Sequence, residues 1–355
     1  MKKHFIYLLA IVGLFLISCE NETTTSPDTS EESSSLLILT EGGIGHNNST
    51  LANFSIEDEV LIYDYFRSAN NRGLGDTSND MILYGSKLYI LVNVSGTIEV
   101  LDPKTGKSIK QIPMKMEDGQ SKQPRQIAAY GGKIYVTSFD DTVTRIDTLT
   151  LQADASITVG LDPEGITISD GKLYVSNSGG LNFMNDYDNT ISVIDVATFT
   201  LDKEIEVVIN PSDLGKDSNG NIYIASIGNY FDVFGAFQKF NTTTQEVSVI
   251  EEVGAPGKFI IHDNIAYIIK GSYGNPYSVL VYDCLNSKIV RDNFITDNTG
   301  IEIIHSIDID PETGDMFIME SDYSTPGTVY WFNKEGQLKV KIPAVGINPT
   351  AAVIL

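Results

Sequence analysis

Apolar and polar residues alternate in short runs along most of the chain, and turn residues separate the runs. Residues 159–180, VGLDPEGITISDGKLYVSNSGG, illustrate this: Ile166 and Ile168 alternate with polar residues, Asp170-Gly171 marks a turn, and KLYVS forms a second strand. A two-stranded hairpin of this size is not stable alone in water. The hairpin must therefore pack on a unique core or be one copy of a repeated unit.

The second strand of this hairpin recurs along the chain. The runs SKLYILVN, GKIYVTSF, GKLYVSNS, GNIYIASI, NIAYIIKG and GDMFIMES place an aromatic residue at equivalent positions: Tyr89, Tyr135, Tyr174, Tyr223, Tyr267 and Phe317. The intervals between them are 46, 39, 49, 44 and 50 residues. Self-similarity at this period is typical of a propeller or another repeat array.

A third strand follows in most units, and a turn such as DPKTG then leads to a fourth. The third strands are the alternating runs TIEVLD, TVTRID, TISVID, SVLVYD and TVYWFN. Four antiparallel strands per unit make a propeller blade, and a β-sandwich with coincidental similarity is the alternative. The apolar faces are rich in Leu, Ile, Val and Tyr, and no helix is expected anywhere.

The two chain ends complete one unit between them. LLILTEGG at 36–43 is a second strand without a preceding partner, and GINPTAAVIL at 346–355 matches GLDPEGITIS at 160–169. The C-terminal strand is therefore expected as the innermost strand of the N-terminal blade, which closes the ring. The prediction is an all-β, seven-bladed β-propeller with four-stranded antiparallel blades over residues 36–355 as one domain.

The first residues indicate export and attachment to a membrane. A basic start and an apolar run from Phe5 to Ile17 form a signal peptide over residues 1–18, too short for a comfortable membrane span. Leu16 to Cys19 resembles a bacterial lipobox, which implies that Cys19 is lipidated; an ordinary secretory signal is the alternative. Residues 19–35 hold almost no apolar side chains and are expected to be a disordered tether.

Charge limits the classes of binding partner, and cysteine content limits the ways in which the fold can be stabilised. The chain has 47 Asp and Glu against 24 Lys and Arg, a net charge of −23, so nucleic acid is a poor partner. Cys284 is the only cysteine besides Cys19, so no disulfide is available after lipidation and a large core must stabilise the fold. The expected location of the protein is the outer membrane, facing the cell surface. Glu20 and Glu22 weakly resemble a surface-export signal.

A propeller offers one concave polar site, the funnel mouth at which its inner strands begin. The residues that follow the loop proline should lie there, namely Arg125, Glu164, Ser212, Gly257 and Thr350, with Lys258 and His305 near. Arg125 and Glu164 carry opposite charges and are candidates for ligand binding. The alternative is that they pair with each other as plain structure.

The loops between second and third strands differ strongly in length. Two are minimal turns (94–96 and 139–141), whereas the loops at 177–189, 226–236, 270–278 and 320–327 are long and aromatic, and the loop at 41–50 is long and polar. Exposed aromatic rings beside Asn, Asp and Gly are typical of recognition surfaces. We expect Tyr187, Tyr230, Tyr273 and Tyr323 to point outward, although the rings could instead pack on one another.

Catalytic patterns are missing from the sequence. His46, His262 and His305 are isolated in sequence without metal-ligand spacing, and nucleophile elbow, phosphate-loop and zincin motifs are absent. The Asp residues that end the third strands at equivalent positions have the pattern of turn formers: Asp102, Asp147, Asp195 and Asp283. Asp308 and Asp310 lie in IDIDPETG, which resembles a calcium loop, but its alternation predicts a strand and a turn. We therefore expect a binding protein with no catalytic residues, no metal and no cofactor; a propeller lyase or lactonase is the alternative.

The repeats, GKLYVSNS…NTISVIDVATF above all, resemble the YncE-like seven-bladed propellers, and residues 40–81 and 321–355 resemble Bacteroidota surface lipoproteins of that fold. That group includes cobalamin-capture lipoproteins that sit over a TonB-dependent outer-membrane transporter. The resemblance implies a corrinoid bound at the mouth, with His46 and His305 as candidate cobalt ligands. It implies these further contacts: Asn47, Asn70, Arg72, Arg125 and the four tyrosines. A scaffold that binds an envelope protein or glycan is the alternative.

Overall fold

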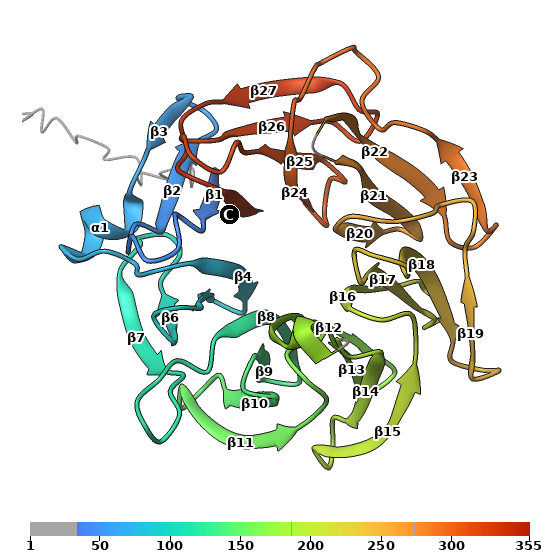
Figure 1. Cartoon of the computed structure of the whole chain (residues 1–355). Coiled ribbons are helices and arrows are strands. Elements are labelled where there is room, and N and C mark those ends of the chain that lie inside the picture. The colour runs from blue at the N-terminus through green and yellow to red at the C-terminus, as the bar shows by residue number, and fades with distance from the viewer. Residues whose placement is uncertain (1–33, 186, 273) are drawn as a thin grey trace, which may run out of the picture. The chain divides into compact units, whose positions relative to one another are not determined.

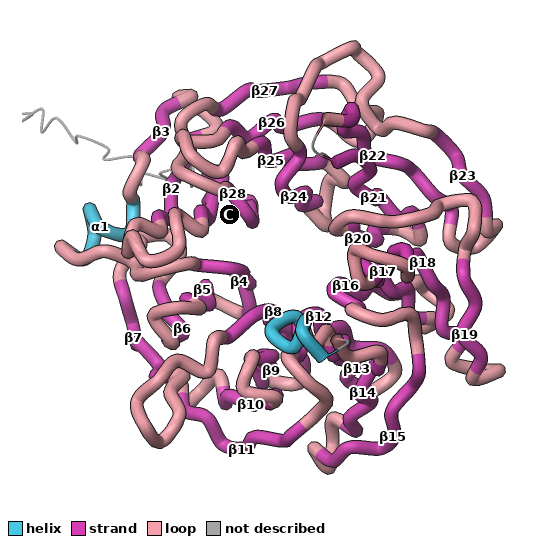
Figure 2. The backbone as a smooth tube through the Cα atoms, in the orientation of Figure 1, coloured by secondary structure: helices cyan, strands magenta, loops and turns pink. Residues whose placement is uncertain are grey.

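The computed structural model describes residues 34–355 except 186 and 273, and these residues form one compact unit. The unit is a ring of seven four-stranded antiparallel sheets, seen along the ring axis in Figure 1 and as a tube in Figure 2. The predicted seven-bladed, all-β architecture is confirmed. The predicted signal peptide and Cys19 lie outside the described residues, and the first strand begins at Ser35, one residue before the expected boundary.

The strands of every blade follow one another from the axis outward, and blade 1 alone takes its innermost strand from the C-terminus. Blade 1 holds β28 (Pro349–Ile354), β1 (Ser35–Thr40), β2 (Thr50–Ser55) and β3 (Val60–Ile62); blade 2 holds β4 (Ser78–Tyr84), β5 (Lys87–Val92), β6 (Thr97–Leu101) and β7 (Ser108–Pro113). Blade 3 holds β8 (Pro124–Tyr130), β9 (Lys133–Ser138), β10 (Thr142–Asp147) and β11 (Gln152–Thr158); blade 4 holds β12 (Pro163–Ser169), β13 (Lys172–Asn177), β14 (Thr190–Asp195) and β15 (Thr200–Glu206).

Blade 5 holds β16 (Pro211–Lys216), β17 (Ile222–Gly228), β18 (Phe234–Asn241) and β19 (Glu246–Val249). Blade 6 holds β20 (Phe259–His262), β21 (Ile265–Ser272), β22 (Asn275–Asp283) and β23 (Lys288–Arg291). Blade 7 holds β24 (Ile304–Ile309), β25 (Met316–Glu320), β26 (Thr328–Phe332) and β27 (Leu338–Ile342).

The core lies between neighbouring blades and is built by the second and third strands. The repeated aromatic residues of the second strands are buried there; Tyr89, Tyr223 and Phe317 are fully buried. One cluster joins Tyr89 and Leu91 of blade 2 to Ile134 and Val136 of blade 3. Each such side chain contributes roughly 1.5–3 kcal/mol when fully buried, so the stability of the ring is spread over all of its blade interfaces.

The chain ends close the ring as the sequence predicts. Strand β28 pairs antiparallel with β1, in a register that joins Leu36 to Ile354 and Leu39 to Ala351. This register leaves no unpaired edge between the first and last blades, because β28 becomes the inner strand of blade 1 (Figure 1). Both termini of the described unit therefore lie in one sheet.

A turn at the mouth precedes the inner strand and recurs in several blades. In blade 4, Asp162 precedes the proline with φ 44° and its carbonyl oxygen accepts the N–H of Ser178 at 3.2 Å. The inner strand then has a bulge directly after the proline, between Pro163 and Ile166. The same left-handed residue before proline occurs at Gln123, Asn210 and Asn348.

Two short helices correct the expectation of a helix-free fold. Strand β3 has only three residues, and α1 (Tyr65–Asn70) follows it because the Asp64 side chain caps the helix by accepting the N–H of Arg67. A 3₁₀ segment, η1 (Gly180–Asn185), occupies the long loop of blade 4. Among the helices of the described residues, none has the length and apolar character needed to cross a membrane.

Candidate functional site

The mouth carries one equivalent residue from each blade, at the bulge of the inner strand in six blades and just before β20 in blade 6. In order around the ring these are Thr350, Asn79, Arg125, Glu164, Ser212, Gly257 and His305. The structure thus places together at the mouth the residues that the sequence pattern selected. Side-chain chemistry at this ring is not repeated from blade to blade, in contrast to the apolar second strands.

A pocket of about 360 Å³ opens at the mouth across blades 3 to 6. Four of the predicted ligand-binding residues line it, namely Arg125, Glu164, Tyr187 and Tyr230, together with Lys258. Ser178, Asn210 and Ser212 add polar groups to the wall. This volume is at the lower end of the range of drug-sized ligand sites, so a larger ligand would rest partly on the rim.

Arg125 and Glu164 form an ion pair inside this pocket. Oε1 of Glu164 accepts from Nε and Nη2 of Arg125 at 2.9 and 2.5 Å, and the guanidinium lies 4.5 Å from the ring centre of Phe139. The structural pairing considered as an alternative therefore exists. It leaves the outer edges of both groups on the pocket wall, where a ligand can still reach them.

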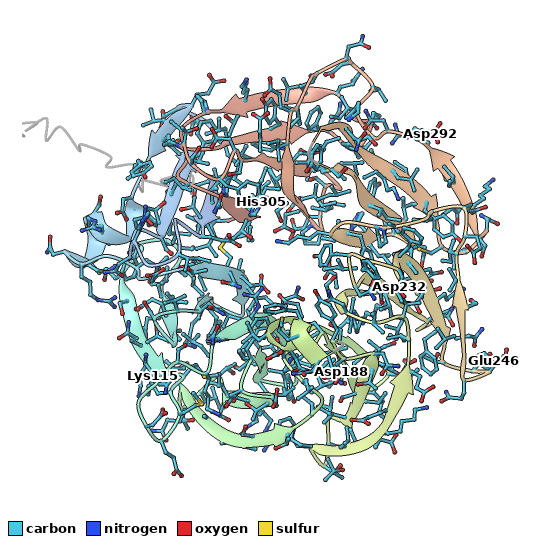
Figure 3. The ribbon with its side chains drawn as sticks, in the orientation of Figure 1. Lys115, Asp188, Asp232, Glu246, Asp292 and His305 are labelled. Carbon is cyan, nitrogen blue, oxygen red and sulfur yellow. The ribbon has the colours of Figure 1, made fainter. Side chains whose placement is uncertain are left out.

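Glu41 and His305 meet near the axis. Oε2 of Glu41 lies 3.7 Å from Nε2 of His305, and the hydroxyl of Tyr323 lies 3.5 Å from Nδ1 of the same ring. Burial raises the pKa of Glu41, while burial and the charge of Lys258 lower the pKa of His305 to about 3. His305, seen at the inner margin of the ring in Figure 3, is therefore neutral at physiological pH.

Sequence reasoning missed Glu41 as a site residue. Glu41 is the first residue after β1, and aligning LLILTE with the other second strands would have placed it at the mouth. Its side chain is 22% exposed and faces the charges of Lys258, Arg125 and Glu164. The acidic residue at this place occurs in one blade, so no repeat marked it.

The predicted tyrosines that the structure describes are held in left-handed backbone conformations. The φ angles of Tyr187, Tyr230 and Tyr323 are 45°, 59° and 64°, which is uncommon for bulky residues and is typical of strained functional loops. Tyr230 and Tyr323 are 77% and 61% exposed, as expected, whereas Tyr187 is half-buried. Tyr273 lies outside the described residues.

The loop that carries Tyr230 is ordered by a single side chain. Oδ1 of Asn229 accepts the backbone N–H groups of Phe231, Asp232 and Val233 at 3.0, 3.0 and 2.9 Å. The exposed rings are therefore presented by a rigid turn rather than by a loose loop. This rigidity lowers the entropy cost of binding at these rings.

Blades 4 and 5 present an apolar rim that we name the aromatic crest, comprising the exposed side chains of η1, of the β17–β18 loop and of Phe234 at the start of β18. Its most exposed members are Phe231 at 88%, Phe234 at 85% and Met184 at 80%. The sequence interpretation selected these loops but not these residues. The crest borders the pocket through Gly180, Ile227 and Tyr230. Exposed apolar groups gathered in this way mark interaction sites.

Asn70 and Arg72 are corrected by the structure, because neither reaches the mouth. Nδ2 of Asn70 donates to the carbonyl of Gly106 at 2.8 Å, and its Oδ1 accepts the N–H of Ser108 at 2.9 Å, which ties α1 to the outer strand β7. Arg72 pairs at 2.9 Å with Glu99 on β6. Asn47 and His46 are exposed on the 41–50 loop.

Metal-binding groups are not evident in the described part of the chain, where no three or more His, Cys, Asp and Glu side chains are grouped to hold an ion. The strand-ending aspartates are turn formers, as predicted: Oδ1 of Asp147 accepts the N–H groups of Leu149 and Thr150 at 3.0 and 2.7 Å. Asp310 binds Thr313 in the same manner, which confirms a turn in IDIDPETG.

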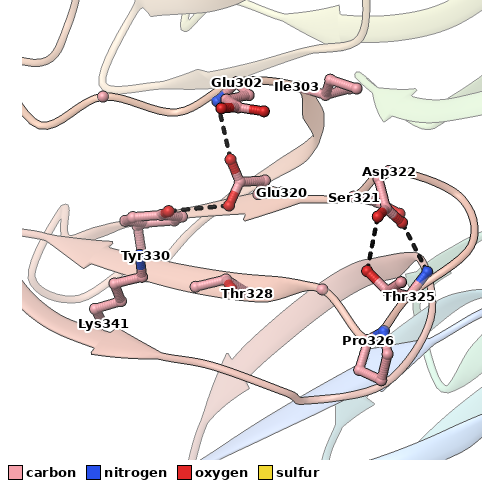
Figure 4. A pocket seen from close by; sticks show the side chains of 12 residues that line it. Glu302, Ile303, Glu320, Ser321, Asp322, Thr325, Pro326, Thr328, Tyr330 and Lys341 are labelled. Carbon is pink, nitrogen blue, oxygen red and sulfur yellow. Dashed lines mark hydrogen bonds between the residues drawn. The ribbon is translucent and has the colours of Figure 1, made fainter.

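A second pocket of about 450 Å³ lies on blade 7, between the 320–327 loop and the segment at 300–303 (Figure 4). Two of its carboxylates are already bonded within the blade. Glu320 accepts the N–H of Glu302 and the hydroxyl of Tyr330, both at 2.9 Å, and Asp322 accepts from Thr325 at 2.7 Å. These two carboxylates therefore serve the local structure of blade 7.

Comparison with solved structures supports the fold. The chain is similar to a quinonprotein alcohol dehydrogenase-like protein from Bacteroides thetaiotaomicron, at 15% identity over 90% of this chain and 78% of that chain, with a TM-score of 0.67. It is also similar to hydrazine synthase of Kuenenia stuttgartiensis, at 17% identity over 75% and 85% of the two chains, with a TM-score of 0.59. At such identities the likeness shows the propeller fold alone.

Comparison with protein families extends over nearly the whole described unit. The family model described as "Domain of unknown function (DUF5074)" matches residues 34–344. No curated protein gives a significant match to this chain. The match covers all four strands of blade 7 and ends before the closing strand β28.

Proposed function

We propose that this chain, which belongs to the DUF5074 family, is a binding protein that captures a ligand at the funnel mouth and catalyses no reaction. One observation carries the proposal: a single pocket gathers Arg125, Glu164, Tyr187 and Tyr230, which come from two inner strands and two loops of different blades. Convergent polar groups beside rigid aromatic rings are characteristic of ligand sites.

The ligand that we propose is a corrinoid, as the resemblance of the repeats implies. A flat, amide-rimmed molecule suits the two tyrosine rings, and the Arg125–Glu164 pair supplies both donors and acceptors for its amides. A corrinoid exceeds the pocket and would lie across the rim toward the aromatic crest. No bond from cobalt to His305 is needed, because only 10% of that side chain is exposed and its Nε2 faces Glu41.

Calorimetric titration with cyanocobalamin tests this proposal. We expect a Kd of ~1 µM or tighter for the wild type and at least ~10-fold weaker binding for the double variant Tyr187→Ser, Tyr230→Ser. Leu149→Ser is the matched control, because Leu149 is 89% exposed on the face opposite the mouth. If the wild-type protein shows no heat of binding, a corrinoid is not its ligand. If Leu149→Ser binds cyanocobalamin as weakly as the double variant, the mouth is not the binding site.

We also propose that the protein is anchored in the outer membrane through acyl chains on Cys19 and passes its ligand to a TonB-dependent transporter. The lipobox-like sequence and the polar segment 19–35 support this anchoring. Growth with labelled palmitate should label the wild type and not Cys19→Ala, and the variant should move to the soluble fraction. Labelling of Cys19→Ala would contradict it.

A second candidate function is an envelope scaffold that binds a protein or glycan through the aromatic crest. The observation that favours it is the exposure of Phe231 and Phe234 at 88% and 85%. Pull-down from solubilised outer membranes separates the two functions. A partner lost with Phe231→Ser, Phe234→Ser but kept with Tyr187→Ser, Tyr230→Ser indicates the scaffold.

A further inference from the structure

Lys258 is the cation at the mouth whose ammonium has no hydrogen bond or ion pair within the described residues. It follows Gly257, is exposed and lines the mouth pocket. Neighbouring cations are all engaged: Arg125 with Glu164, Lys122 with Asp140 at 2.6 Å, and Lys270 with the carbonyls of Val253 and Ala255. The ammonium of Lys258 is therefore available to a ligand that enters the pocket.

Lys258 lines the mouth pocket together with Tyr187 and Tyr230. Its charge lowers the pKa of ionisable groups in four other blades: Glu41 of blade 1, Asp80 of blade 2, Asp213 of blade 5 and His305 of blade 7. Lys258 therefore gives the pocket wall beside the two tyrosines a positive charge that no carboxylate of the described residues pairs with.

The surrounding carboxyl groups do not neutralise this charge by direct contact. The carboxylates of Asp80 and Asp213 each accept a backbone N–H of the next blade, from Ile127 at 3.0 Å and from Phe259 at 3.1 Å. Burial is the main cause that raises the pKa of Asp80, to about 7, and of Asp213 and Glu41. These acids are thus less charged, or less available, than their number suggests.

His305 does not supply a donor to this pocket. Its side chain is 10% exposed, its Nε2 is buried 3.7 Å from Oε2 of Glu41, and its ring stays neutral. His305 is not among the residues that line the pocket, so Lys258 is the cation on the pocket wall that the described residues leave unpaired.

We propose that Lys258 binds one anionic group, a carboxylate or a phosphate, of a ligand whose planar part lies against Tyr187 and Tyr230. The inference rests on the proposed function, since it assigns the substrate class of the same mouth.

Phenyl phosphate and benzamide are the probes for this proposal, because they share a ring and differ in charge. We expect calorimetry to show phenyl phosphate binding at millimolar Kd or tighter to wild type and at least ~10-fold more weakly to Lys258→Met, with Lys258→Arg within ~3-fold of wild type. Lys110→Met removes the same charge from the exposed outer strand β7 and should change nothing.

Three results would overturn the inference: no binding of phenyl phosphate to wild type, unchanged binding to Lys258→Met, or benzamide binding as tightly as phenyl phosphate. Circular dichroism of each variant establishes that it is folded. The corrinoid proposal can fail independently of this one, because cyanocobalamin can fail to bind while the binding of phenyl phosphate still depends on Lys258. If phenyl phosphate binding is lost in Lys258→Met but not in the double variant Tyr187→Ser, Tyr230→Ser, the anion site at Lys258 is supported and the role of the two tyrosines is contradicted.

Discussion

Acidic residues behave in opposite ways on the back face of the ring, opposite the mouth, and along its axis. At the back-face turns, the bonds from Lys133 and the backbone hold the pKa of Asp147 below its usual range, and backbone and Lys172 bonds do the same for Asp195. Along the axis, burial raises the pKa of Asp80 to about 7 and that of Asp308 to about 6. One residue type therefore serves two purposes in the same fold.

The difference separates scaffold from site. Back-face acids recur at equivalent positions, and each is satisfied by the turn that it forms. Axial acids occur in only some of the blades, Asp80 and Asp213 directly after the bulge residues of blades 2 and 5 and Glu41 in blade 1, and burial disfavours their charge. The repeat thus builds the ring, and the residues that break the repeat give the mouth its chemistry.

The largest effect is expected from removing the strand that both faces share. Deletion of residues 349–355 removes β28, which exposes the edge of β1 and leaves the ring open. We expect this variant to lose cooperative unfolding in circular dichroism. A deletion variant that kept a sharp transition within a few degrees of wild type would show that ring closure matters little.

Replacing an acidic residue on the back face should lower the stability of the fold measurably, but less than deletion of β28. The buried carboxylate of Asp217 accepts the N–H groups of Asn219 and Asn221 at 2.9 and 3.0 Å and Nδ2 of Asn221 at 2.8 Å. We expect Asp217→Ala to lower the free energy of unfolding by about 2–3 kcal/mol in urea titrations. Asp217→Asn, which keeps an acceptor, should recover part of the loss; an unchanged midpoint for Asp217→Ala would contradict a scaffold role.

The ionisation of an axial acid should lower the stability of the fold, in contrast to that of a back-face acid. Because the pKa of Asp80 is raised in the folded state, that state binds a proton more tightly than the unfolded chain, so stability is full below pH 4 and falls as the pH rises through about 7. Asp308 and Lys258 face the same carboxyl. We expect Asp80→Asn to reduce the stability difference between pH 5 and pH 8 by ~2 kcal/mol. An unchanged pH dependence would contradict this assignment.

The smallest stability effect is expected at the rim. Tyr230 is 77% exposed and has a left-handed backbone, which glycine adopts without strain. We expect Tyr230→Gly to leave the free energy of unfolding unchanged or raise it by up to ~1 kcal/mol, while ligand binding weakens. A marked loss of stability in thermal unfolding would show that this ring is structural.

Residues that repeat from blade to blade could be predicted from the sequence, whereas residues that occur once were harder to place. Tyr89, Tyr135 and the third strands repeat, so their period predicts the blades, and the match of 346–355 to 160–169 predicts the closure. Arg125 and Glu164 were found because they follow the repeated proline. Asn70 and Arg72 were assigned to the mouth from the resemblance alone, whereas the structure bonds Asn70 to Gly106 and Ser108 and Arg72 to Glu99. Glu41 was missed because it occurs once.

Hydrogen exchange measured with and without cyanocobalamin tests the central claim most directly, since it reports both faces in one experiment. The account predicts protection in the mouth segments 177–189, 226–236 and 256–258, with no change in the back-face turns 102–107, 147–152 and 195–200. Protection in the back-face turns, or none at the mouth, would contradict it.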